Sequence, residues 1–174
     1  MIPTREFVEL DKLIHDRASF DCGQEELNTF LISSAARHKD AGISRTMVLP
    51  EANVLSPAGI CAYYTLSHTE IKRDTLPTSL AKKLPRYPLP VILIAQLTVH
   101  RALQGRGLGK TTLICALEHV LEINDHLPSY AVVIDAIDER IQSFYEQYGF
   151  KNLYSHQQRT RLFISMNTVK QLFE

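Results

Sequence analysis

The most constraining feature of this sequence is a glycine-rich turn that joins an apolar strand to a long helix. The run "VILIAQLTV" at residues 91–99 has the apolar, β-branched character of a buried strand. "QGRGLGKTT" follows at 104–112, and "LGKTTLICALEHVLEIN" has the apolar spacing of a helix. A turn of this kind aims backbone N–H groups and the positive end of a helix at one point, where an anion can bind. The pattern therefore predicts an α/β fold with a phosphate-binding loop.

The loop fits two phosphate-binding motifs. Gly109-Lys110-Thr111 ends like a Walker A loop, and the later "AVVID", which ends in Asp135, looks like a Walker B strand. However, the first glycine of a Walker A loop would fall at position 104, which is Gln104. A nucleoside triphosphatase also builds most of its sheet after this loop, and residues 112–174 are too few for such a sheet. The same loop fits Q-x-x-G-x-G, which holds the pyrophosphate of coenzyme A, and we favour this interpretation over both the nucleotide loop and a glycine turn without a ligand.

Other patterns predict the elements around this loop. "FDCGQEELNTFLISSAARHKD" predicts a helix, with Asp21 as its N-cap and Gln24 completing a capping box. "SRTMVLP" and "AGICAYYTLSHTEI" predict a β-hairpin, whereas four prolines in 74–90 predict a basic loop without a regular helix or central strand. After the long helix we expect, in order, a strand in "SYAVVIDAI", a short helix in "DERIQSFYEQYG", and strands in "FKNLYS" and "TRLFISM".

Bulk composition narrows the class of protein. A chain of 174 residues is predicted to form a single domain over residues 1–174. The formal net charge is +0, so charge alone predicts no nucleic-acid partner, although residues 71–90 carry an excess of lysine and arginine. Three scattered cysteines, no apolar run of membrane-spanning length and no signal-peptide pattern predict a cytoplasmic protein. The histidines and cysteines show no metal-ligand spacing, so we expect no metal site.

Two stretches resemble the motifs of one enzyme family. "LTVHRALQGRGLGKTTLICALEH" resembles motif A of the GNAT N-acetyltransferases, and "IQSFYEQYGF" resembles their motif B. The resemblance implies the GNAT fold, a mixed and mostly antiparallel central sheet flanked by helices, with acetyl-CoA in a cleft beside the fourth strand. It implies that the backbone of Leu97, Thr98 and Val99 binds the pantetheine arm, and that Tyr145 donates a proton to the departing thiolate. The residues implied to hold the pyrophosphate are Gln104, Gly105, Arg106, Gly107, Leu108, Gly109 and Lys110.

Further segments resemble a narrower group, the GNAT toxins of toxin–antitoxin modules (TacT, AtaT and KacT among them). These segments are "FDCGQEELNTFL", "ISRTMVL", "AYYTLS", "LPRYPLPVILIAQLTVHRALQGRGLG" and "RLFISM". The resemblance implies an enzyme that acetylates the α-amino group of aminoacyl-tRNA and so inhibits translation. It also implies a homodimer that a ribbon–helix–helix antitoxin neutralises.

The sequence departs from the toxin pattern at several positions. Gln96 stands where the toxins have arginine, His100 where they have an acidic residue, and Phe30 where they have tryptophan. The chain is also neutral, whereas proteins that bind tRNA are often basic. The basic loop 71–90 forms a candidate positive face together with further cations, namely Arg37, Lys39, Arg159 and Arg161.

Two other functions therefore stay open. One is a GNAT enzyme that acetylates a different amine, such as a protein N-terminus, a polyamine or a small molecule. The other is a module that binds acetyl-CoA or a partner protein without catalysis.

Overall fold

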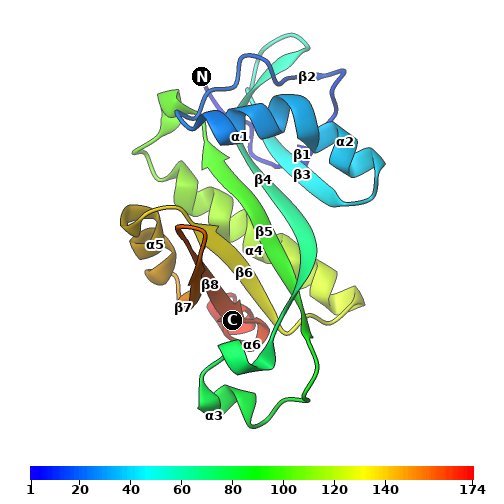
Figure 1. Ribbon diagram of the computed structural model, residues 1–174. Helices are drawn as coiled ribbons and strands as arrows, with labels where there is room; N and C mark the ends of the chain where they lie inside the picture. Colours follow the sequence, from blue (N-terminus) through cyan, green and yellow to red (C-terminus); the bar gives the residue numbers. More distant parts are fainter. The chain divides into compact units, whose positions relative to one another are not determined.

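The computed structural model describes residues 1–174, which divide into two compact units. Unit 1 comprises Met1–Ser67 and Ala95–Ala116, and unit 2 comprises His68–Ile94 and Leu117–Glu174. Three elements run from one unit into the other, namely β4 (Ala58–Ile71), β5 (Leu89–Val99) and α4 (Leu108–His126) (Figure 1).

Unit 1 is built on the predicted hairpin. β3 (Ser44–Pro50) pairs antiparallel with β4, and this part of the prediction is confirmed. Two short strands extend the hairpin. β1 (Val8–Glu9) pairs antiparallel with β3, and β2 (His15–Asp16) pairs parallel with β4.

The predicted first helix is present, but it begins and winds differently from the prediction. It consists of α1 (Glu25–Thr29), a π-helical turn η1 (Phe30–Ser34) and α2 (Ala35–Asp40), and it lies along β3 and β4 (Figure 1). The predicted cap is wrong, because Gln24 occupies the N-cap position and no side chain caps the helix. Asp21 instead accepts hydrogen bonds from the Gly23 N–H and from the Arg101 guanidinium, both at 2.8 Å.

Unit 1 buries apolar side chains in two clusters. The first, which includes the helix residue Leu31, consists of Leu10, Phe20, Cys22, Leu31, Ala35, Val48, Ile60 and Tyr63. The second includes residues that flank the glycine-rich loop and consists of Leu49, Cys61, Ala62, Val99 and Leu103. The end of β5 is thus fixed by packing where the loop begins.

Unit 2 continues the sheet from β5. Over Val91–Ile94, β5 pairs parallel with β6 (Ala131–Ala136). β6 then pairs antiparallel with β8 (Arg159–Ser165), and β8 pairs antiparallel with β7 (Lys151–His156). The strand order is β1-β3-β4-β5-β6-β8-β7, so the sheet is mixed and mostly antiparallel, as predicted.

Two helices of unit 2 pack against this part of the sheet. α5 (Glu139–Glu146) contacts β6 and β8, and it lies beside the β7–β8 hairpin in Figure 1. α6 (Met166–Leu172) follows β8 directly and contacts it. The prediction contains α5 but not α6.

The proline-rich segment contains more regular structure than predicted. It contains a 3-10 turn η2 (Arg73–Thr75) and one short helix α3 (Thr78–Ala81). Its leucines pack into a core cluster of unit 2 that includes Val91 and Phe163, which explains how a segment rich in proline is held in place. β5 also begins at Leu89, so Pro90 lies inside a strand, near its start, where a missing N–H is tolerated. In neither unit is there a helix with the length and apolar character needed to cross a membrane.

Candidate active site

The glycine-rich loop has a backbone that only glycine adopts readily. Gly105 and Gly107 have φ angles of +76° and +83°. A Cβ added at either residue would meet nothing within 4 Å. Backbone conformation rather than crowding therefore requires glycine here, and the missing side chains leave the loop open to a ligand.

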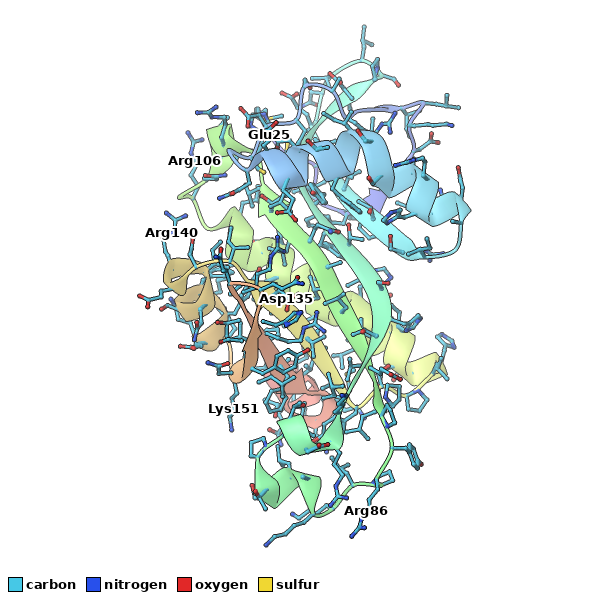
Figure 2. All side chains as sticks on the ribbon, viewed as in Figure 1. Glu25, Arg86, Arg106, Asp135, Arg140 and Lys151 are labelled. Atoms are coloured by element: carbon cyan, nitrogen blue, oxygen red, sulfur yellow. The ribbon has the colours of Figure 1, made fainter.

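The loop leads into an electrically positive helix end. The N–H of Thr111 donates to the Gly107 carbonyl at 3.2 Å. The N–H groups of Leu108, Gly109 and Lys110 precede it, so they have no acceptor within the helix. No acidic residue lies in the first turn of α4, and the exposed Arg106 side chain extends away from the loop (Figure 2). Such a helix end binds anions, phosphate groups in particular.

The Walker A alternative does not fit this helix end. The hydroxyl of Thr111 donates to the Gly107 carbonyl at 3.3 Å, and the hydroxyl of Thr112 donates to the Leu108 carbonyl at 2.8 Å. Both hydroxyls are thus engaged with their own helix. The Walker B candidate is also engaged, because the Asp135 carboxylate accepts two hydrogen bonds from Arg161, at 2.8 and 2.9 Å. Asp135, labelled in Figure 2, is the partner of an arginine in the sheet.

Gln104 holds the loop against the protein. Its amide nitrogen donates to the Val99 carbonyl at 2.9 Å and to the Cys22 carbonyl at 2.8 Å. The sequence predicts Gln104 among the residues that bind the cofactor. Its side chain instead links the loop to two other segments, the end of β5 and the residues before α1.

A second tie joins the same two segments. Arg101, in the 3-10 turn η3 (Arg101–Leu103), forms an ion pair with Asp21 at 2.8 Å. The hydrogen bond from Arg101, together with those from the Gly23 N–H and Asn28, lowers the pKa of Asp21 to about 2. The sequence reasoning missed this pair, because Asp21 and Arg101 are distant in the chain and no local pattern links them.

The predicted cofactor strand runs directly into the loop. Leu97 and Thr98 are half-buried and Val99 is buried. The N–H of His100 donates to the Cys61 carbonyl at 2.8 Å, and the His100 ring packs edge-on against Phe20. In unit 1 the structure therefore brings together Leu97–Val99, Gln104 and residues 105–110.

Tyr145 belongs to unit 2 and lies in α5. Asp138 caps this helix by accepting from the Ile141 N–H at 2.8 Å. The Tyr145 side chain packs against the rings of Phe144 and Phe150, with centroids 5.3 and 5.7 Å away. Burial raises the pKa of Tyr145, so its phenol is neutral and retains a proton to donate.

Two of the cations expected on a positive face are already paired. Lys39 lies 3.3 Å from the Glu9 carboxylate, and Arg161 is held by Asp135. Within unit 2, by contrast, Lys82, Lys83 and Arg86 of the proline-rich segment are exposed. This segment is therefore the stronger part of the predicted basic surface.

The geometry is that of a strand, an anion-binding loop and a helix, and comparison with known proteins decides which family uses it. Residues 91–168 match the model of the acetyltransferase (GNAT) domain. The region that contains the candidate site is therefore similar to a GNAT acetyltransferase domain. The predicted fold class and the predicted enzyme class, an N-acetyltransferase, are both confirmed.

Two curated relatives of the chain are named as toxins. A tRNA-acetylating toxin of Mycobacterium tuberculosis (strain ATCC 25618 / H37Rv) is 27% identical over 136 residues, which are 78% of each chain. A probable toxin TacT of Sinorhizobium fredii (strain NBRC 101917 / NGR234) is 26% identical over 171 residues, 94% of this chain and 92% of the relative.

Solved structures similar to this chain include toxins with their ligands. AtaT complexed with acetyl-methionyl-tRNAfMet superposes with a TM-score of 0.86 and 27% identity, over 97% of this chain and 99% of AtaT. AtaTR bound with AcCoA superposes with a TM-score of 0.82 and 29% identity, over 97% of this chain and 98% of AtaTR. A mutant AtaT toxin bound to the C-terminus of the antitoxin AtaR superposes with a TM-score of 0.80 and 26% identity, over 98% of each chain.

Proposed function

We propose that this chain is a toxin that transfers the acetyl group of acetyl-CoA to the α-amino group of aminoacyl-tRNA and so inhibits translation. The observation that carries the proposal is the likeness to AtaT complexed with acetyl-methionyl-tRNA, which extends over 97% of the chain. We further propose that residues 1–174 act as one GNAT domain and that the enzyme works in the cytoplasm.

The glycine-rich loop and the end of β5 are the proposed acetyl-CoA site, and acetyl-CoA supplies an activated acetyl group there. The backbone N–H groups of residues 105–110 bind the pyrophosphate, supported by the positive φ angles of Gly105 and Gly107 and by the first N–H groups of α4, which have no acceptor within the helix. The Gln104 N–H instead donates to the Arg101 carbonyl at 3.4 Å. The backbone of Leu97, Thr98 and Val99 binds the pantetheine arm. Gln104 acts mainly through its side-chain amide, which fixes the loop against β5.

The reaction makes modest demands on acid–base chemistry. The amine of an aminoacyl ester resembles an α-amino group, whose pKa is about 8, so much of it is neutral near pH 7 and needs no strong base. The departing thiolate needs a proton, which we assign to the neutral phenol of Tyr145. General acid catalysis of this kind contributes about 10²–10⁴-fold.

The proposal includes two protein partners. A small ribbon–helix–helix antitoxin neutralises the enzyme, and two copies of the chain form a homodimer. Support for the antitoxin comes from the similarity to the AtaT toxin that was solved with the C-terminus of AtaR.

Induced expression in a bacterial host tests the proposed function. We expect the wild-type chain to arrest growth and the Tyr145→Phe variant to relieve the arrest, because phenylalanine keeps the ring packing and removes only the hydroxyl. Tyr148→Phe is the matched control, since Tyr148 is in the turn after α5 and also packs against Phe144. Growth arrest that is relieved equally by both variants, or a harmless wild type, would contradict the assignment.

A further inference from the structure

The side chain of Gln96 contains a buried oxygen without a partner. Its Oε1 atom has almost no solvent exposure and accepts no hydrogen bond within the protein, although the residue as a whole is only half-buried. Buried polar atoms are nearly always paired, because leaving one unpaired costs folding free energy. Ser44 Oγ is in the same condition. Ser44 begins β3, whereas Gln96 is the residue immediately before the proposed pantetheine-binding backbone in β5.

In β5, Gln96 lies on the face opposite to that of Val99. Side chains alternate along a strand, so Gln96 and Thr98 point away from the face of Val99. Val99 packs with Leu103 in the second core cluster of unit 1. His100, which follows Thr98 by two residues, contacts Phe20 of the first cluster.

The proposed path of the cofactor leads to this residue. With the pyrophosphate at residues 105–110, the pantetheine arm passes Val99 first and Leu97 last. The thioester end of the arm therefore lies toward Gln96. An amide oxygen at this position can accept a hydrogen bond from an N–H group, which an arginine, the residue of the related toxins, cannot do.

We propose that Gln96 Oε1 binds the acceptor substrate by accepting a hydrogen bond from its attacking amine. This inference rests on the proposed function. In the transfer, the amine nitrogen forms a bond to the acetyl carbon and the carbon–sulfur bond breaks. The sulfur takes one proton and the nitrogen loses one to water. Gln96 takes neither proton, because it orients the amine and stabilises the positive charge that develops on it.

Steady-state kinetics of Gln96→Leu, with charged bulk tRNA and labelled acetyl-CoA, test this proposal. We expect kcat/KM for charged tRNA to fall by about tenfold to a hundredfold, the effect of losing a hydrogen bond to a charged group. The KM for acetyl-CoA should stay within about twofold, and the Tm should be unchanged or higher, because an unpaired buried oxygen is removed. Gln96→Glu keeps an acceptor oxygen, so it should retain the wild-type KM for the acceptor. It should also move the pH profile of kcat upward, because a carboxylate stabilises the protonated form of the bound amine.

Ser44→Ala is the matched control, since it removes the other unpaired oxygen. It should leave the kinetics unchanged. Unaltered acceptor kinetics in Gln96→Leu, or a loss that accompanies a lower Tm, would overturn the proposal.

The proposed function can fail separately from the role of Gln96. If the wild type leaves charged tRNA unlabelled but acetylates a peptide or polyamine, tRNA is the wrong substrate, and Gln96→Leu must then impair transfer to that amine. If the wild type acetylates none of these amines, the role of Gln96 falls together with the proposed function.

Discussion

Gly107 and Gly42 form a matched pair of residues for testing the phosphate loop. Their φ angles are +83° and +72°, and both have open space where a Cβ would be added. Alanine should destabilise either position by about 1–2 kcal/mol, the cost of a left-handed backbone. Only Gly107 lies in the loop, so only Gly107→Ala should also raise the Kd for acetyl-CoA, by about tenfold. Thermal unfolding and calorimetric titration measure the two effects, and equal weakening of binding in both variants would refute the loop assignment.

His15 predicts a pH dependence of stability. Its side chain is buried, and its Nδ1 accepts from the Asp11 N–H at 2.9 Å. Burial lowers the pKa of His15 below 6.5, and the nearby Asp11 only partly offsets this effect. As pH falls through 6.5, His15 becomes protonated in the unfolded chain but stays neutral in the folded chain. The free energy of unfolding should therefore rise with pH just below 6.5 and level off above it.

Urea denaturation between about pH 5 and pH 8 measures this slope. His15→Asn keeps a hydrogen-bond acceptor near the position of Nδ1 but does not titrate, so the slope should become smaller. His156→Asn removes an exposed histidine and is the control. If the slope of the unfolding free energy against pH is unchanged in His15→Asn, groups other than His15 cause it.

Among the elements, the join between β5 and α4 depends on Gln104. Gln104→Glu replaces its amide donor with an acceptor that faces the Val99 and Cys22 carbonyls. We expect a loss of about 1–3 kcal/mol in the free energy of unfolding and weaker acetyl-CoA binding, because the loop is no longer fixed. Gln142→Glu, in an exposed pair with Glu146 on α5, is the control for the charge change. Undiminished acetyl-CoA affinity in Gln104→Glu would contradict the positioning role.

The elements were predictable where local pattern determines them. The strand of residues 91–99, the glycine turn and α4 follow from periodicity and from the special backbone freedom of glycine, and the structure contains all three. The cap at Asp21 was wrong because a distant residue, Arg101, engages that carboxylate. The π-helical turn η1 and the short helix α3 depend on tertiary packing, so the sequence pattern did not indicate them.

The site was predictable to a similar degree. The loop residues follow from one motif, and their backbone conformation is suited to the predicted role. What a motif does not contain is the use of each side chain. The two hydrogen bonds of Gln104 and the unpaired oxygen of Gln96 depend on segments that only the fold brings near them.

For the whole molecule, the neutral net charge raises the question of how it would bind RNA. The exposed cations Lys82, Lys83 and Arg86 lie in one short segment, so binding by this segment does not require a basic protein. Replacing all three with glutamine should weaken charged-tRNA binding and reduce the slope of log K against log salt by about three, one per lost phosphate contact. Acetyl-CoA affinity is the internal control. If the salt slope of the triple variant equals that of the wild type, the RNA binds to a surface other than this segment.

The identity of the acetylated product tests the proposed function most directly. Charged bulk tRNA is incubated with the purified chain and acetyl-CoA, digested with a nuclease, and its aminoacyl-adenosine fragments are examined by mass spectrometry. We expect fragments that carry one acetyl group on the amino acid with the wild type, and far fewer with Tyr145→Phe. Aminoacyl-adenosine without added acetyl, from an enzyme that binds acetyl-CoA normally, would contradict the proposed function.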